Sequence, residues 1–518
     1  MSGNLIIPRG FIVFGLCIPL AIFLGFMLAD PLDTTNMMVV GIVLLGISTP
    51  IILKHHYFAL IFSWNAFVNA FFLPGQPSLW LALSGLSLFL AVLTKALNRD
   101  ALKFYWEPSI ILPLGFLIAV VVGTAYLTGG IGMQALGSQV YGGRRYAAIG
   151  ASFLGFLALT SRGIEPQQRN LVLALFLIPP VTAAFSNLAY AIGPSAYILF
   201  YLFPTDWVLS QAVADSSIES AGQVRIGGLA PAAFAICTYI LAKYRLEDLI
   251  NLRKPVAMLC FIGSISVGLF SGFRSTLVLL GIVLIILFIL EGLHKTKAMI
   301  LSISIVLAGL FFIYASARFM PHAIQRSLSL LPGLQVDSVA KFDAEVSLEW
   351  RFQMWEIVLA EASQYFWIGK GYAINPMDLF LSTEAVKRGF AKGYEPAIIA
   401  GDYHNGPLSI IIPFGIFGTI GFIWFIIAGC RLLRRNLLYG DPDISHVNRF
   451  LYAFFLAKIV FFVFFFGAFS TDLPIFAGIL GLSIALNKGI RMKAPALIKR
   501  PADIADAFVA TTPSTAPA

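Results

Sequence analysis

Residues 401–407, Gly-Asp-Tyr-His-Asn-Gly-Pro, place a histidine where a long polar segment meets a long apolar one. His404 titrates near neutral pH, so it can take a proton from a hydroxyl group and release it again. Asn405 or Gly406 can cap the following helix, and Pro407 suits its first turn. The positive end of that helix should lower the pKa of His404, which favours the neutral imidazole that a general base needs. His404 is therefore the candidate catalytic base; the alternative is a histidine that only caps a membrane helix.

Two arginines stand in glycine-containing turns beside apolar runs. Arg225 follows an acidic loop and opens the run that starts at Ile226, and Arg274 lies in the turn 271–275 between two runs. A guanidinium offers a planar fork of donors that suits phosphate oxygens, and glycines let a ligand approach the backbone closely. Each arginine could instead reach lipid headgroups or pair with a loop acid. Because both lie on the side predicted for His404, they favour an anion site.

The segment 346–362 carries apolar residues at helical spacing, which predicts an amphipathic helix that could lie over the membrane mouth. Arg351 on this segment is a third candidate ligand for an anion. Its neighbours Glu349 and Glu356 offer ion pairs as the simpler explanation. Residues 376–396, with mixed charge and glycines, are predicted to form a mobile lid.

The composition is that of a polytopic membrane protein. The 518 residues are 58% hydrophobic and 12% charged, with a mean hydropathy of +0.86, whereas soluble domains average about 25% charged residues. The net charge of +9 comes from Lys and Arg clustered in short loops, which indicates membrane orientation and no nucleic-acid partner. The four cysteines fall in or at the end of apolar runs, so no disulfide or zinc site is indicated.

Apolar runs of roughly 20 residues, some of them shorter, predict an all-α fold with about fourteen transmembrane helices. Residues 1–315 hold eleven of them, residues 316–404 form a large loop, and residues 405–487 hold three more. Pro413 with the glycines after it predicts a kinked, closely packed helix. The tail 488–518 is predicted to be cytoplasmic and disordered from about Ala494. The runs are 11–29, 37–53, 57–73, 79–94, 109–127, 146–160, 171–190, 226–242, 256–270, 276–290, 298–315, 408–429, 450–469 and 473–486, with a shorter apolar piece at 197–203.

Alternate loops carry the positive charge, which predicts that both termini are cytoplasmic and that residues 316–404 face the periplasm. The acidic loop with Asp206, Asp215 and Glu219 falls on the same outer side. A few arginines lie there against the rule, and such a placement is costly unless the cation has an anion to bind. These exceptions are Arg144, Arg145, Arg225 and Arg274.

The order of these motifs resembles the superfamily of O-antigen ligases and Wzy-type polymerases. The motifs are Arg225 at a helix start, the Ser-Gly-x-Arg-Ser turn of Arg274, a large loop with Arg351-x-x-x-Trp355, then Gly369-x-Gly371-Tyr372 and Asp402-Tyr403-His404-Asn405. The order of the motifs and their predicted placement on one membrane face carry the resemblance. It covers about residues 225–421.

The resemblance implies a metal-independent, cofactor-free glycosyltransferase of the bacterial inner membrane. Such enzymes move a glycan from undecaprenyl diphosphate to a hydroxyl group of a lipid or glycan acceptor at the periplasmic face. By the same resemblance His404 is the general base, and Arg225 and Arg274 hold the diphosphate. Arg351, Asp402 and Asn405 are supporting residues. Ligase and polymerase share this chemistry, so the acceptor stays open.

Two other classes of protein remain alternatives. A polysaccharide or lipid transporter would also have many helices, but charges buried in mid-helix and broken helices in paired halves are not evident in the sequence. A non-enzymatic scaffold of a polysaccharide assembly complex would tolerate the loss of His404. A nucleotide-driven pump or a metalloprotease is disfavoured because the sequence has no phosphate-binding loop and no zinc motif.

Overall fold

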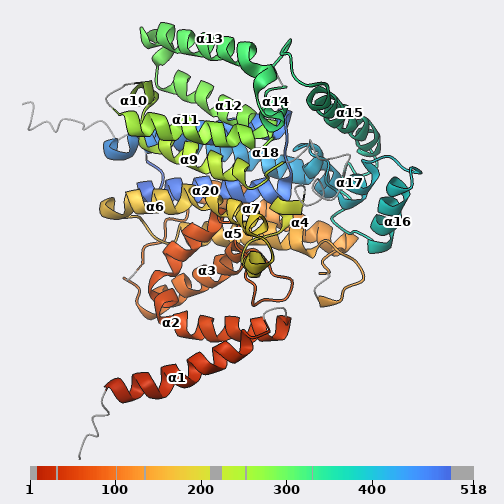
Figure 1. Cartoon of the computed structure of the whole chain (residues 1–518). Helices are drawn as coiled ribbons and strands as arrows, with labels where there is room; N and C mark the ends of the chain where they lie inside the picture. The colour runs from red at the N-terminus through yellow and green to blue at the C-terminus, as the bar shows by residue number, and fades with distance from the viewer. Residues whose placement is uncertain are drawn as a thin grey trace, which may run out of the picture.

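The computed structural model describes residues 9–30, 33–100, 102–133, 136–209, 225–250, 254–329 and 331–491. Within these ranges the chain is helical, with two isolated β-bridges and no strand, so the predicted all-α fold is confirmed. Figure 1 shows α20 in the middle of the bundle, α1 and α2 at one edge and α13 at the opposite edge. The helices are α1 Arg9–Met27, α2 Thr34–Asn65, α3 Leu79–Leu97, α4 Pro108–Thr128, α5 Gly143–Leu159, α6 Arg169–Leu177, α7 Ala183–Ile192, α9 Leu229–Lys243, α10 Leu246–Ile250, α11 Pro255–Phe270, α12 Arg274–Leu290, α13 Ala298–Ser316, α14 His322–Leu328, α15 Ser338–Glu361, α16 Pro376–Lys387, α17 Glu395–Ala400, α18 Leu408–Tyr439, α19 Ser445–Phe464 and α20 Phe469–Asn487.

Seven helical segments among the described residues are long and apolar enough to cross a membrane. The most apolar stretch of α20 is 83% buried inside the protein. In the segment Met299–Phe319, which includes most of α13, none of that stretch is buried. The bent helix α2 adds a further candidate span, and four apolar helices are shorter, at 10–17 residues. Membrane association follows from these helices. The total of fourteen transmembrane helices, and the side of the membrane on which each loop lies, stay predictions.

The third predicted span, residues 57–73, is wrong as a separate helix. Residues 34–65 form the single helix α2, which bends by 112° between its halves 35–51 and 53–65. It ends at Asn65, whose Nδ2 donates to the Phe176 carbonyl at 2.8 Å, and residues 66–78 are not helical. The Phe67 amide donates to Thr182 Oγ1 at 2.9 Å. An apolar segment that finds partners of this kind does not need a helix to satisfy its backbone.

The seventh predicted span, residues 171–190, is interrupted. Helices α6 and α7 flank a 3₁₀ segment, Pro179–Thr182, because two successive prolines have no amide hydrogen to continue the helical ladder. Together the elements of Pro166–Ile192 are still long enough to span. The apolar piece at 197–203 falls on another 3₁₀ helix, Pro194–Tyr201, which at eight residues is too short to cross, as predicted.

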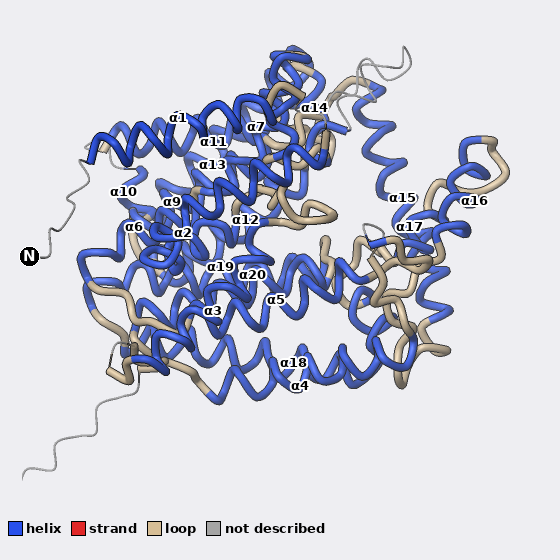
Figure 2. Tube along the Cα trace, turned by 90° about the horizontal axis from the view of Figure 1, so that it is seen from below, coloured by secondary structure: helices blue, strands red, loops and turns tan. Residues whose placement is uncertain are grey.

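Helices α14 to α17 occupy the predicted large loop. The helix expected at 346–362 is observed as α15, which starts earlier because the side chain of Asp337 accepts a hydrogen bond from the Val339 amide at 2.8 Å. Its amphipathic placement over the membrane stays a prediction, since Leu348, Phe352 and Leu359 of the predicted apolar stripe are exposed. The predicted lid, 376–396, contains α16 and the start of α17. Figure 2 shows α14 to α17 at one end of the bundle and α10 at the other. The predicted tail from Ala494, and Asp215 and Glu219 of the acidic loop, lie outside the described residues.

The predicted kink in the helix after His404 is present. Gly415 has φ 59° and ψ −158°, so the helical backbone of α18 is interrupted just after Pro413. The backbone amide and carbonyl groups that lose their helical partners at this break form hydrogen bonds with the segment between α15 and α16. The bonds are Lys370 N to Ile412 O at 2.9 Å, Gly371 N to Pro413 O at 3.0 Å, and Ile416 N to Phe366 O at 2.7 Å. The loop is thereby fixed against a membrane helix, as a break in a span requires.

Candidate active site

His404 has a strained backbone, and hydrogen bonds hold the two residues that precede it. Its φ is +50°, a left-handed conformation that costs a residue with a side chain roughly 1–2 kcal/mol. The Tyr403 carbonyl accepts from Trp355 Nε1 at 2.8 Å, and the Asp402 amide donates to the Ala397 carbonyl at 2.8 Å. Strain of this kind persists where the surroundings over-determine the conformation, and it concentrates at functional sites.

The predicted cap after His404 is confirmed. Asn405 Oδ1 accepts from the Leu408 amide at 3.0 Å, and Pro407 directly precedes the first residue of α18. The role of Asn405 visible in the structure is therefore to start the helix. Asn405, and not His404, therefore caps α18. The alternative in which the histidine only caps a helix does not describe the structure.

Two aromatic rings flank the imidazole of His404. The ring centroids of Trp350, from α15, and Phe466, from the turn between α19 and α20, lie 5.4 Å and 5.2 Å from the imidazole centroid. The side chain of His404 remains 25% exposed, so a substrate hydroxyl can reach it. Asp402 Oδ1 lies 3.6 Å from His404 Nδ1, close enough for a strong charge interaction but long for a hydrogen bond.

The surroundings favour a neutral His404. Burial lowers its pKa below the ordinary value, Asp402 opposes this shift, and the positive charge of Arg351 adds to it. The predicted direction is thus observed, but the cause differs. We attributed it to the helix dipole, whereas desolvation by neighbouring side chains and a nearby guanidinium account for it in the structure. A neutral imidazole near pH 7 has the protonation state of a general base.

Arg225 and Arg274 meet at one turn. Arg274 is the first residue of α12 and follows Gly272, which has φ +76°. The side chain of Arg225 crosses this turn, with Cζ 5.8 Å from the ring centroid of Phe273. One expectation was wrong: helix α9 starts at Leu229, so Arg225 lies before the helix and not at its first turn. A guanidinium pair at the positive end of α12 suits an anion.

Arg351 connects this pair to His404. Its Cζ lies 5.9 Å from the ring centroid of Phe466. Burial lowers the pKa of its guanidinium, and the charges of Arg274 and Arg225 act in the same direction. The ion pairs proposed with its neighbours on α15 do not form among the described residues, since Glu349 instead accepts from Gln353 and neither glutamate lies within ion-pair distance of Arg351.

A fourth arginine at this site was not predicted. Arg326, on α14, is only 5% exposed, and a Cβ atom built on Gly272 would lie 3.9 Å from its Cδ and 3.5 Å from Cγ of Arg225. Arg326 therefore packs against the same turn as Arg225. The rule of membrane orientation could not single it out, because that rule applies to short loops and Arg326 lies in a long one.

Arg145, one of the predicted exceptions to the orientation rule, supports the histidine loop. Its Nη1 donates to the carbonyl of Gly401 at 3.3 Å, and its guanidinium lies over the ring of Tyr372 with 5.2 Å between Cζ and the centroid. Gly401 directly precedes Asp402. The partner of Arg145 is thus a backbone carbonyl next to the site, while its neighbour Arg144 is exposed.

Residues 258–423 match the family model described as O-antigen ligase, Wzy_C. This part of the chain is an O-antigen ligase domain. The resemblance predicted from the motifs is confirmed, and the domain contains Arg274, Arg351, Asp402, His404 and Asn405. No curated protein matches the chain.

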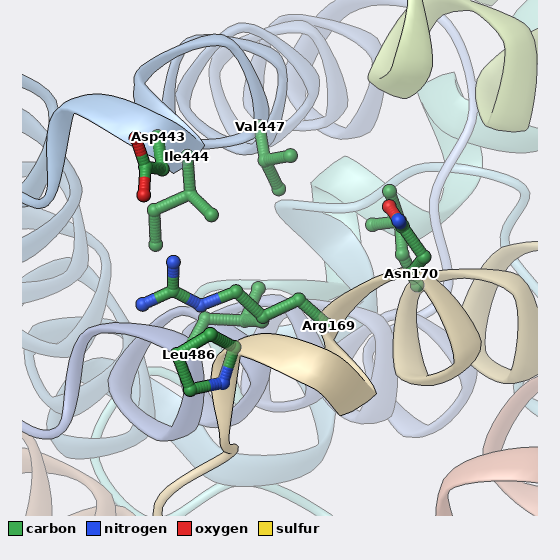
Figure 3. A pocket seen from close by; sticks show the side chains of 8 residues that line it. Arg169, Asn170, Asp443, Ile444, Val447 and Leu486 are labelled. Atoms are coloured by element: carbon green, nitrogen blue, oxygen red, sulfur yellow. The ribbon is translucent and has the colours of Figure 1, made fainter.

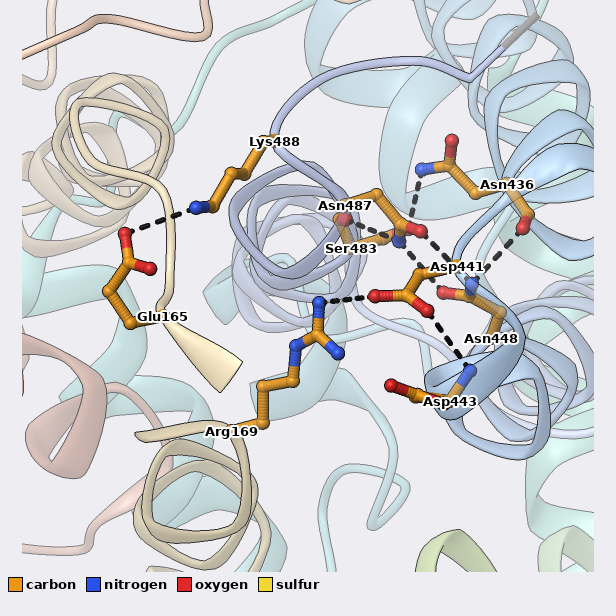
Figure 4. Close-up of polar contacts among 9 residues, drawn as sticks. All are labelled: Glu165, Arg169, Asn436, Asp441, Asp443, Asn448, Ser483, Asn487 and Lys488. Atoms are coloured by element: carbon orange, nitrogen blue, oxygen red, sulfur yellow. Dashed lines mark hydrogen bonds and ion pairs between the residues drawn. The ribbon is translucent and has the colours of Figure 1, made fainter. Parts of the chain in front are cut away.

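A cavity of about 220 Å³ lies away from the candidate site described above. It is lined by the starts of α6 and α19, and its wall includes Arg169 and Asp443 (Figure 3). His404 precedes the first residue of the 32-residue helix α18, whereas Asp443 follows its last residue, so the two regions lie at opposite ends of that helix. Arg169 is paired with Asp441 at 2.7 Å, so its charge is already balanced (Figure 4).

Buried amides beside that cavity join the last three helices of the bundle (Figure 4). Asn448 and Asn487 exchange two hydrogen bonds, of 3.0 Å and 2.8 Å, and Asn436 Nδ2 donates to Ser483 Oγ at 3.0 Å. Buried polar groups paired in this way lose little on leaving water. These hydrogen bonds therefore hold α18, α19 and α20 together at this end of the bundle.

Proposed function

We propose that the protein is a membrane glycosyltransferase that moves an undecaprenyl-diphosphate-linked glycan to an acceptor hydroxyl. The observation that carries the proposal is the juxtaposition of His404 with Arg351, which is itself within electrostatic reach of Arg225 and Arg274. A neutral base next to a group of guanidiniums fits a reaction in which a proton is removed and a diphosphate leaves. The O-antigen ligase family supports the same class of substrate.

The residues divide the chemistry between them. In our proposal the neutral imidazole of His404 takes the proton of the acceptor hydroxyl while its oxygen attacks the anomeric carbon of the donor glycan. The bond between that carbon and the diphosphate oxygen breaks, and undecaprenyl diphosphate leaves with the electron pair. Negative charge therefore grows on the diphosphate, and guanidiniums already in place stabilise it better than water does. Because these cations supply the charge, we propose that the transfer is metal-independent.

Asp402 and Arg351 act on the base in opposite directions. Asp402, 3.6 Å from Nδ1, stabilises the imidazolium that forms once the proton has been taken. Arg351 disfavours that imidazolium, which keeps the resting histidine neutral and helps it to release the proton afterwards. The two charges therefore balance proton uptake against proton release.

We also propose that the site faces the periplasm of a bacterial inner membrane and that both termini are cytoplasmic. In a variant without its four native cysteines, Arg388→Cys on the predicted outer side should react with a reagent that does not cross the membrane. Arg435→Cys, exposed near the end of α18, should stay unmodified until the cells are opened. The reverse pattern would place the site on the wrong side for a donor displayed outside the cell.

Deletion of the gene tests the function in cells. Gel analysis of the surface glycans should show loss of attachment if the protein is a ligase, and loss of chain length if it is a polymerase. Glycans of unchanged size, amount and attachment would contradict both.

A further inference from the structure

Phe466 contacts two members of the proposed site at once. Its ring centroid lies 5.2 Å from that of the His404 imidazole, and Cζ of Arg351 lies 5.9 Å from the same ring. Phe466 lies outside residues 258–423, and no chemical group in its side chain marks it as a candidate in the sequence. The inference drawn from this contact rests on the proposed transfer reaction and adds a residue to it.

The side chain of Asp472 holds the turn that carries Phe466. Asp472, in the first turn of α20, accepts from the Ala468 amide at 2.8 Å through Oδ2. Its Oδ1 lies 2.7 Å from Nζ of Lys458 on α19, and both side chains are less than 10% exposed. Loss of either partner of such a buried ion pair is costly in stability, because the other charge would be left unpaired in an apolar surrounding. The pair therefore fixes the turn between the two helices.

The same turn is bonded to the loop of His404. The Phe469 amide donates to Ser409 Oγ at 2.9 Å, and Ser409 Oγ donates to the Gly406 carbonyl at 2.6 Å. A Cβ atom built on Gly467 would lie only 2.9 Å from Cα of Gly406, so the two backbones are in direct contact. The ring of Phe466 and the imidazole of His404 are thus carried by two segments that form one packed unit.

We propose that Phe466 is a positioning residue for glycan transfer, which orients the imidazole of His404 against the guanidinium of Arg351 and shields the imidazole from water. The charged groups that act on His404 are Asp402 from its own loop and Arg351 from α15. The third neighbour, Trp350, is also on α15 and is uncharged. Removal of the Phe466 ring leaves these charges in place and changes the hydration and orientation of the imidazole.

The test compares Phe466→Leu, Phe466→Tyr and Phe465→Leu in a transfer assay with purified protein at several pH values. Loss of the ring admits water, which favours the charged imidazole, so the rise of activity with pH should move to higher pH. The rate near pH 7 should fall on the order of 10-fold, since small errors of placement are costly in catalysis. Phe466→Tyr keeps the ring and should keep the rate and the pH profile. Phe465→Leu, on the exposed neighbour, should match wild type.

Each outcome decides between a positioning role and a structural one. If Phe466→Leu lowers the rate equally at every pH, or leaves both rate and profile unchanged, the inference is wrong. Correctly folded Phe466→Tyr with the defect of the leucine variant would also overturn it. His404→Gln in the same assay separates this from the proposed function. If that variant transfers glycan at the wild-type rate, the base assignment itself fails, whatever Phe466 does.

Discussion

Substitution of Gly369 by alanine should destabilise the protein at the break in α18. Gly369 has φ +83°, and an added Cβ atom would lie 2.2 Å from the carbonyl oxygen of Pro413. That oxygen cannot easily move, because it accepts the hydrogen bond of the Gly371 amide at 3.0 Å. The new methyl group therefore meets fixed backbone, and relief requires the loop to leave the helix.

The expected size follows from two separate terms. The left-handed backbone costs alanine roughly 1–2 kcal/mol. The collision adds about 1–3 kcal/mol, which is usual for an overpacked interior. Gly389→Ala is the matched control, because Gly389 has φ +76° and nothing within 4 Å of the added atom. Only the backbone term applies there.

Thermal unfolding of the three detergent-solubilised proteins, followed by the loss of the monodisperse peak in size-exclusion chromatography, measures the difference. Gly369→Ala should unfold at a clearly lower temperature than Gly389→Ala, which should in turn lie slightly below wild type. Equal midpoints for the two variants would refute the argument, since they would show that the segment before α16 is not packed against the break in α18.

Two further substitutions test the charged groups. Arg225→Lys and Arg274→Lys keep the charge but lose the planar fork, so each should lower transfer on the order of 10²-fold at normal protein level; full activity in both would make them headgroup or topology residues. Lys458→Met leaves Asp472 buried without its partner and should destabilise the protein by about 3–5 kcal/mol. The double variant Lys458→Met with Asp472→Asn removes both charges but keeps an oxygen that can accept from the Ala468 amide. It should recover most of that loss in the same unfolding measurement, and failure to do so would show that the unpaired charge is not the cause.

The sequence allowed the class of fold to be predicted, and it pointed to the centre of the candidate site, for a physical reason. In a chain that is 58% hydrophobic, a titratable residue beside the start of a span is conspicuous, and His404 was found in this way. Arg225 and Arg274 were found because a cation on the side of a membrane that carries few of them is costly. The start of α18 was also predictable, since Asn405 and Pro407 signal it locally.

What was missed depends on contacts between distant parts of the chain. Residues 66–73 are as apolar as the rest of the predicted span 57–73, so hydropathy could not show that the helix ends at Asn65. Their hydrogen bonds to distant segments, such as that of the Phe67 amide to Thr182 Oγ1, make the difference. Arg326 and Phe466 come from elements far from His404 in sequence, and neither has a local pattern that signals a role. The cause of the lowered pKa of His404 was wrong for the same reason, because burial by Trp350 and Phe466 is a property of the packed structure.

The central claim is that His404 is the base, and His404→Gln tests it most directly. Glutamine keeps polarity and approximate size but cannot accept a proton near neutral pH, so the purified variant should accumulate normally and transfer on the order of 10²–10⁴-fold less glycan. The donor in this measurement is an undecaprenyl-diphosphate glycan. Wild-type transfer should fall as the pH drops through the lowered pKa of His404, because protonation removes the base. A glutamine variant with the wild-type rate, or one whose rate falls with pH as wild type does, would contradict the account.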